Sequence, residues 1–299
     1  MGNICCQNKV TALNIKKTIF IKKEFDIYVY DPIILGDGVS GNSYKLKINN
    51  KTLTCKKVKK EHFDMAYDEI EILKEIDDKK YLPIFFNAIQ TPKYLYIMYN
   101  YLDGVDLLQM TQNPTFDIRE TNTLANIIKE ITNGLYALFK HNYVHLDIKL
   151  ENIIIKKTKP VQIKIIDLAY CKKLTGKNNI LEPIGTYGYA SPEVLIYKRY
   201  FHNTDVWSLG VVLYGLITNC PLFINTKKCN TAIEEMNRFV NIYDRSCYLK
   251  NVDINLIDLM NKMLKKTPSS RLSIKDILHH KFITINSTDD LGKYCLTNI

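Results

Sequence analysis

The sequence predicts an α+β chain in two parts, a β-rich part up to about residue 102 and a mainly helical part after it. In the first part, apolar and polar residues alternate in short runs such as Tyr44–Ile48, as they do in half-buried strands. After Asp103 and Gly104 the apolar residues recur at helical spacing instead, most clearly between Leu124 and Phe139.

The strands and the helix of the first part follow from local patterns. Asn49 and Asn50 form a turn signal between two alternating runs, and Ile70, Leu73 and Ile76 lie at helical spacing. The expected elements of this part are strands at 33–35, 44–48, 52–58 and 94–101, and a helix at 66–76. Another strand is expected to pair with 94–101.

The second part is expected to be helical except around two short β-rich pieces at 152–155 and 162–166. Helices should then dominate from Asp205 to about Phe282. These patterns divide the chain into a basic N-terminal segment, two lobes and a C-terminal tail. The expected boundaries are 1–23, 24–102, 103–283 and 284–299.

Composition excludes several classes of function. The 299 residues are 46% apolar and 24% charged, which is ordinary for a soluble globular protein. No apolar run approaches the roughly 18 residues of a bilayer span, and no signal-peptide segment follows the amino terminus. The chain is therefore expected in the cytoplasm. The net charge of +10 is dispersed and shows no basic and aromatic pattern, so no nucleic-acid partner is expected.

The eight cysteines do not indicate a metal or disulfide framework. None forms a CxxC pair, which disfavours a zinc ribbon or a thioredoxin-type site. Without a secretion signal, reduced thiols are expected.

The run HLDIKLEN, residues 145–152, concentrates groups suited to phosphoryl transfer. Asp147 can accept a hydroxyl proton, and Lys149 can neutralise phosphate charge. Asn152 and Asp167 offer the oxygen ligands that Mg²⁺ prefers. A structural explanation is easy for any single one of the four residues and hard for all four in this order.

Gly36, Gly38 and Gly41 form the run GDGVSG between two strand-like segments. A dinucleotide-binding fold would need a helix directly after these glycines. The alternating run that follows favours a β-hairpin over phosphates, where glycine allows the backbone to approach closely. An ordinary hairpin turn is the alternative.

These motifs resemble eukaryotic-type protein kinases of the serine/threonine class. HLDIKLEN and KIIDLAY are similar to the catalytic and metal-binding loops, and GTYGYASPE, DVWSLG and TPSSRL to later segments of the family. The resemblance covers about residues 30–283. It implies a two-lobed protein kinase fold with a small β-rich N-lobe and a larger, mainly helical C-lobe. It also implies ATP as phosphoryl donor, Mg²⁺ with Mn²⁺ as an alternative, and a protein substrate.

The resemblance gives further residues a role. Lys56 would contact the α and β phosphates and pair with Glu69, and Thr186 would bond Asp147 and Lys149. Lys57 is a rival for Lys56, but it would put the strand out of register. The implied nucleotide site is Leu35, Gly36, Asp37, Gly38, Gly41, Ser43, Thr54, Lys56, Tyr99, Asn100, Leu102, Asp106 and Ile154. Three structural residues are implied as well, with Glu193 and Arg271 as a buried ion pair and Asp205 bonded to the catalytic-loop backbone.

Two departures from the family pattern bear on activity. Leu146 stands where the family usually has the arginine that binds an activation-segment phosphate, and Leu168-Ala169 replaces the usual Phe-Gly. Because hydroxyl residues between Asp167 and Glu193 are also few, we expect activity without phosphorylation of this segment. The alternatives to an active kinase are a pseudokinase scaffold and, less favoured by GTYGYASPE, a small-molecule kinase.

Substrate and membrane preferences are also indicated. Glu151 and Asp106 are placed to receive a basic substrate residue, although Gly215 stands where such kinases often carry another acid. The start MGNICC resembles an acylation signal, with Gly2 for myristate and Cys5 and Cys6 for palmitate. The lysines of residues 1–23 would then favour an anionic membrane surface, on the cytoplasmic face.

Overall fold

The computed structural model describes residues 33–38, 41–48, 51–76, 78–112, 120–156, 162–176, 178–223, 229–239, 249 and 251–287. These residues form two compact units. The first contains the described residues up to Ala66 together with Phe85–Tyr101, and the second contains Tyr67–Ile84 and the residues from Leu102 onward.

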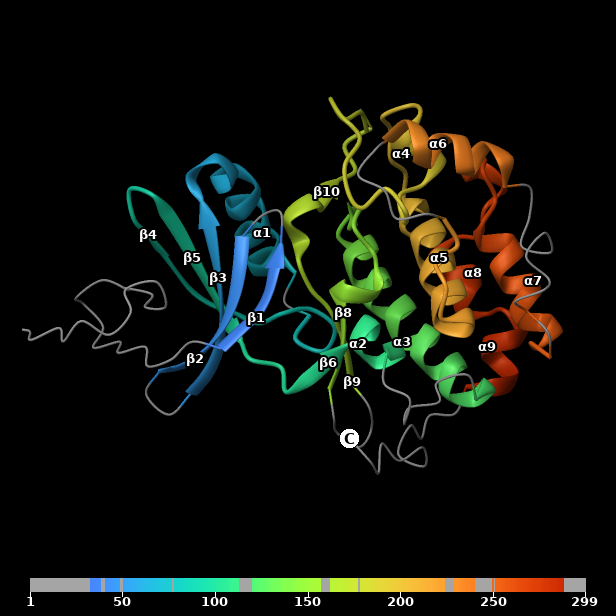
Figure 1. Cartoon of the computed structure of the whole chain (residues 1–299), viewed down its shortest axis with the longest axis horizontal. Helices are drawn as coiled ribbons and strands as arrows, with labels where there is room; N and C mark the ends of the chain where they lie inside the picture. The colour runs from blue at the N-terminus through green and yellow to red at the C-terminus, as the bar shows by residue number, and fades with distance from the viewer. Residues whose placement is uncertain are drawn as a thin grey trace, which may run out of the picture. The chain divides into compact units, whose positions relative to one another are not determined.

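The first unit is a five-stranded antiparallel sheet (Figure 1). Its order is β1-β2-β3-β5-β4, with β1 (Ile33–Gly38), β2 (Gly41–Ile48), β3 (Lys51–Lys59), β4 (Phe85–Gln90) and β5 (Tyr94–Asn100). Strand alternation places apolar side chains on one face, where they form a core of Leu46, Ile48, Leu53, Cys55, Tyr96 and Met98. The strands expected from the sequence are therefore present.

Strands β1 and β2 pair antiparallel with Gly38 opposite Gly41, so the glycine-rich run leads from one strand to the next. This arrangement excludes the strand-to-helix turn of a dinucleotide fold. A Cβ at Gly41, where φ is +147°, would lie 2.2 Å from the Lys57 carbonyl oxygen. Close packing of β2 on β3 therefore requires this glycine. A Cβ at Gly36 would meet nothing within 4 Å.

The second unit is mainly helical (Figure 1). Its helices are α1 (Phe63–Glu75), which begins in the first unit, α2 (Leu107–Gln112), α3 (Thr121–Lys140), α4 (Pro192–Leu195), α5 (Thr204–Thr218), α6 (Cys229–Arg238), α7 (Ile254–Met263), α8 (Ile274–Leu278) and α9 (Lys281–Asn286). Helix α5 is apolar almost all round and buried from Thr204 to Ile217, as expected for a central helix. It packs against α7, and α3 packs against α8 and α9.

Short strands carry the functional loops of this unit. Strands β6 (Gly104–Asp106), β8 (Ile153–Lys156) and β9 (Gln162–Ile165) form one sheet, and β7 (Tyr143–Val144) pairs with β10 (Lys172–Lys173). The loop containing Asp147 connects β7 to β8, and the loop containing Asp167 connects β9 to β10. Pairing of these strands brings two loops that are distant in sequence to the same end of the unit.

The chain passes between the units three times: within α1, between Ile84 and Phe85, and between Tyr101 and Leu102, one residue before the end of the expected N-lobe at 102. Glu75 accepts hydrogen bonds from the Tyr143 hydroxyl at 2.7 Å and from Lys173 Nζ at 2.8 Å. Lys172 forms an ion pair with Asp68 at 3.0 Å. Burial and the bond to Glu75 raise the pKa of Tyr143 to about 12, so its hydroxyl stays protonated and donates. These contacts associate most of α1 with the second unit.

Two further observations concern the ends of the chain and its helices. Helix α9 ends at Asn286, just beyond the expected domain boundary at residue 283. None of the helices in the described ranges combines the length and apolarity needed to cross a bilayer. Gly2, Cys5 and Cys6 lie outside the described residues.

Candidate active site

The catalytic loop is held by the first turn of helix α5. Asp205 is buried there, and its carboxylate accepts hydrogen bonds from the backbone N–H groups of His145 at 2.7 Å and Leu146 at 2.9 Å. Burial raises the pKa of Asp205, although the two N–H groups act in the opposite direction. Leu146 adopts a φ of 67°, which is uncommon for a residue with a branched side chain. The Asp205 bonds therefore stabilise a turn that costs backbone strain.

His145 connects this loop to the metal-binding loop. Its Nδ1 accepts the backbone N–H of Asp147 at 3.2 Å, so the ring proton belongs on Nε2, which donates to the Ile166 carbonyl at 3.1 Å. The ring is completely buried. A histidine with both nitrogens occupied in this way has a structural role.

The carboxylate of Asp147 is the centre of the site. Its Oδ1 accepts from the Thr186 N–H at 2.9 Å and the Thr186 hydroxyl at 2.8 Å. Its Oδ2 accepts from Asn152 Nδ2 and Lys149 Nζ, both at 3.0 Å. Asp147 is 3% exposed, so these four bonds define its orientation tightly.

Lys149 is positively charged, and its ammonium group is directed at the Asp147 carboxylate. Its Nζ lies 3.0 Å from Asp147 and 3.0 Å from the Thr186 hydroxyl oxygen. Burial disfavours the charged form, but the nearby carboxylates, Asp147 foremost, outweigh it and raise the pKa of Lys149. A cation in this position can stabilise negative charge on a transferring phosphoryl group.

Gly185 was not singled out by the sequence, and the structure shows why it matters. Its φ is +83°, and a Cβ would lie 2.3 Å from the Leu146 carbonyl oxygen. Only glycine at position 185 allows the backbone leading to Thr186 to pass so close to the catalytic loop. Its position immediately before Thr186 was the one sequence signal available.

The residues expected to bind Mg²⁺, Asn152 and Asp167, lie on two loops that are bonded to each other. Asn152 donates through Nδ2 to both the carbonyl and the carboxylate of Asp147, so its Oδ1 is directed away from Asp147. The Ile166 N–H donates to the Asn152 carbonyl at 2.9 Å, which holds the loop of Asp167 beside Asn152. Asp167 has a φ of 62° and begins a short 3-10 helix in which Leu168 and Ala169 are buried.

This donor set fits Mg²⁺. The described residues contain no group of three or more His, Cys, Asp or Glu side chains able to hold a metal ion by themselves. Mg²⁺ needs no such cage, because it is commonly bound through one or two protein oxygens together with phosphates and water. One amide oxygen and one carboxylate are therefore sufficient, and oxygen ligands also suit Mn²⁺.

In the first unit, strand register brings together several residues of the expected nucleotide site. Lys56 on β3 pairs with Ser43 on β2, and Thr54 pairs with Tyr99 on β5. Lys56 is 6% exposed, whereas Lys57 Nζ lies 4.0 Å above the ring of Tyr94. Lys56 and Lys57 therefore have different surroundings, and Lys57 is occupied in a cation–π contact.

The remaining expected residues are distributed over both units. Glu69 is buried on α1 in the second unit, so its ion pair with Lys56 would join the units and stays a prediction. Asp106 Oδ1 accepts the Gln109 N–H at 2.7 Å at the start of α2, which gives this carboxylate a capping contact. The others are Leu35, Gly36, Asp37, Gly38, Gly41 and Asn100 on the first sheet, and Leu102 and Ile154 in the second unit.

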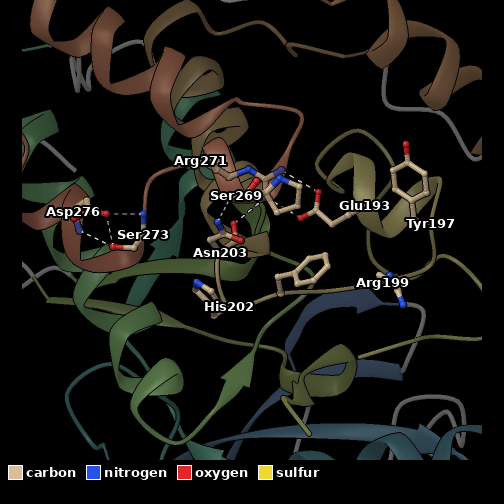
Figure 2. A pocket seen from close by; sticks show the side chains of 11 residues that line it. Glu193, Tyr197, Arg199, His202, Asn203, Ser269, Arg271, Ser273 and Asp276 are labelled. Carbon is tan, nitrogen blue, oxygen red and sulfur yellow. Dashed lines mark hydrogen bonds and ion pairs between the residues drawn. The ribbon is translucent and has the colours of Figure 1, made fainter. Parts of the chain in front are cut away.

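Glu193 and Arg271 form a bidentate ion pair, with contacts of 2.8 and 3.0 Å (Figure 2). The two side chains are 2% and 0% exposed, and the guanidinium lies 5.5 Å from the ring centre of Trp207. The pair lines a cleft of about 700 Å³ whose lining residues do not include Asp147. We therefore assign a structural role to this ion pair, which is separate from the groups that react.

A buried carboxylate bonded by a lysine, an asparagine and a threonine, next to a loop whose carboxylate is predicted to bind a metal, is the arrangement of a phosphoryl-transfer enzyme. On a chain with a β-sheet unit and a helical unit, this site is typical of protein kinases. Residues 31–283 match the family model described as protein kinase domain, and the chain belongs to this family. Members of the family use ATP and Mg²⁺.

Several curated relatives are protein kinases. Calcium-dependent protein kinase 4 of Plasmodium falciparum (isolate 3D7) is 28% identical over 262 residues, covering 86% of this chain and 48% of the relative. Myosin light chain kinase 2, skeletal/cardiac muscle, of Rattus norvegicus is 25% identical, covering 78% and 37%. Serine/threonine-protein kinase 17A of Oryctolagus cuniculus is 24% identical, covering 74% and 56%. The chain thus spans roughly a third to just over a half of these relatives.

Proposed function

We propose that this chain is a serine/threonine protein kinase that transfers the γ-phosphoryl group of ATP to protein hydroxyls. The observation that carries the proposal is the Asp147 carboxylate, buried and bonded by Thr186, Asn152 and Lys149. Lys149 two residues after Asp147 and the threonine at 186 are the features that favour Ser/Thr over Tyr substrates. The named relatives are of the same kind.

Each residue has a defined task in this reaction. Asp147 would orient the substrate hydroxyl and accept its proton as the hydroxyl oxygen bonds to phosphorus. Lys149 would stabilise negative charge on the transferring phosphoryl group. Asn152 and Asp167 would hold Mg²⁺, which neutralises the phosphates when bound, and Lys56 would contact the nucleotide.

The direct test is turnover with ATP and Mg²⁺ on a generic protein substrate, followed by phosphoamino acid analysis. We expect phosphoserine and phosphothreonine. The competing proposal is a pseudokinase scaffold, which the replacement at Leu146 keeps open. It predicts no phosphate transfer from a protein that still binds a partner.

We propose a preference for substrates with a basic residue near the target hydroxyl. Glu151 supports this preference, because it is a half-buried carboxylate within the loop that carries Asp147 and Lys149. Its negative charge also contributes to raising the pKa of Lys149. A substrate cation would pair with this negative charge.

Changing Glu151→Gln tests this preference. For a peptide with an upstream arginine, the KM should rise about tenfold, the value of one charged hydrogen bond. The same peptide with alanine in place of arginine should be phosphorylated equally well by both proteins. Selection of acidic or proline-directed sequences from a peptide array would contradict the proposal.

We also propose that the amino terminus is acylated and associates with the cytoplasmic face of a membrane. The support is the run MGNICC followed by Lys9, Lys16, Lys17, Lys22 and Lys23, since a single acyl chain needs a second signal for stable binding. Mass spectrometry of protein from its native cell should find myristate on Gly2. An unmodified Gly2 would end this proposal.

A further inference from the structure

Two stretches on either side of helix α4 pair with each other, and we call residues 178–182 together with 198–200 the strap. The pairing is antiparallel and centred on the bridge between Asn179 and Arg199. Two backbone hydrogen bonds flank this bridge, Ile180 N–H to Lys198 carbonyl at 2.9 Å and Tyr200 N–H to Asn178 carbonyl at 3.1 Å. The strap therefore holds the segment that leads to Gly185 and Thr186.

Side chains strengthen the same contact. Arg199 Nε donates to Asn179 Oδ1 at 3.0 Å, and Lys198 Nζ lies 3.3 Å from Glu182 Oε2. The buried Tyr200 donates its hydroxyl to the Lys173 carbonyl at 2.9 Å, at the start of the segment. The segment is thus bonded at its beginning and in its middle.

The strap is also connected to the buried ion pair. The Arg199 N–H donates to the carbonyl of Glu193 at 3.0 Å, and the Glu193 side chain is bonded to Arg271 (Figure 2). Because Glu193 is buried and paired, its carbonyl is a fixed attachment point for the strap. The segment before Thr186 is thereby bonded, through the strap, to the core of the second unit.

We propose that the strap holds the segment before Thr186 in its working position without any phosphate, and that Arg199 is a positioning residue for the protein substrate. This proposal rests on the proposed function. Leu146 is a buried aliphatic side chain, so no guanidinium stands there to receive a phosphate. The two cations of the strap, Arg199 and Lys198, are already bonded to Asn179 and Glu182. Lys172 and Lys173, at the start of the segment, form ion pairs with Asp68 and Glu75. The segment is therefore ordered by a hydrogen bond to a neutral side chain and by an ion pair, and not by a phosphate.

The test uses the full chain, treated with phosphatase and shown by intact mass to carry no phosphate. Asn179→Ala, Arg199→Ala and the double variant are compared with Asn179→Asp, which keeps an acceptor for Arg199. Leu181→Ala is the matched control, because Leu181 is on the same segment and 92% exposed. The KM for the protein substrate and the KM for ATP are measured for each.

We expect each alanine variant to raise the KM for the protein substrate about fivefold, the value of one hydrogen bond. The double variant should be no worse than either single variant, because the two changes remove the same bond. Asn179→Asp and Leu181→Ala should behave as the unmodified protein, and the KM for ATP should not move. Thr175→Ala should leave the rate within a few-fold.

Three outcomes of the activity measurements would overturn the proposal. One is an unchanged KM for the protein substrate in both single variants, and another is additive effects in the double variant. The third is loss of activity on phosphatase treatment that rephosphorylation restores. Amide exchange of Ile180 and Tyr200 provides a readout independent of turnover. If the phosphate-free protein is inactive but these two amides exchange slowly, the proposed function is refuted and the strap is not. If the two amides exchange fast, the strap is refuted.

Discussion

Replacing Asp147 by asparagine is expected to lower kcat by about two orders of magnitude or more, the usual contribution of a general base. Asparagine has the same shape, and its Oδ1 can still accept from Thr186. Its other end would carry an NH₂ group facing Asn152 Nδ2 and Lys149 Nζ, which both donate to Asp147 at 3.0 Å. The variant therefore loses the proton acceptor and gains opposed donors within the site.

The measurement is the initial rate of phosphate transfer to protein at saturating ATP and Mg²⁺. Nucleotide binding should persist, because no residue assigned to ATP is altered. Glu71→Gln is the matched control, since it also exchanges a carboxylate for an amide but lies exposed on α1. If Asp147→Asn kept more than about a tenth of the activity, Asp147 would not be the base.

Much of the catalytic site was predictable because its residues lie in two short loops. Asp147, Lys149 and Asn152 belong to one run of eight residues, so their proximity follows from sequence. Thr186 and Asp205 were reached through a family resemblance. The Asp205 contact consists of two backbone N–H bonds, and nothing in the composition of DVWSLG specifies their partner.

Contacts between distant segments could not be predicted where the family resemblance did not imply them. Gly185 is required by the position of the Leu146 carbonyl oxygen, which depends on how the two loops pack. Glu75 is an exposed residue on α1, where helical periodicity alone indicates a surface charge. Its bonds to Tyr143 and Lys173 exist only because β7 and β10 pair beside α1. Periodicity predicts that a helix forms, and its partners are determined by tertiary packing.

Replacing Arg271 by alanine is expected to lower the free energy of unfolding by about 3–5 kcal/mol, because it leaves the buried Glu193 carboxylate without its counter-ion. Arg271 also donates to the Asn203 carbonyl at 3.0 Å and to the Lys265 carbonyl at 3.0 Å. These acceptors would lose their partner too. Thr204, whose hydroxyl donates to Glu193 at 2.9 Å, cannot compensate for a full positive charge.

Urea unfolding followed by tryptophan fluorescence measures this loss, since Trp207 is the only tryptophan and lies against Arg271. Arg238→Ala is the matched control, because Arg238 is an exposed arginine at the end of α6, where substitutions change stability by about 0.5 kcal/mol or less. The double variant Glu193→Gln with Arg271→Met should recover part of the loss, since no unpaired charge remains buried. A loss below about 1 kcal/mol in Arg271→Ala would show that Glu193 finds another partner. Because the Glu193 carbonyl receives the Arg199 N–H, the same variant should also weaken binding of the protein substrate in whatever fraction stays folded.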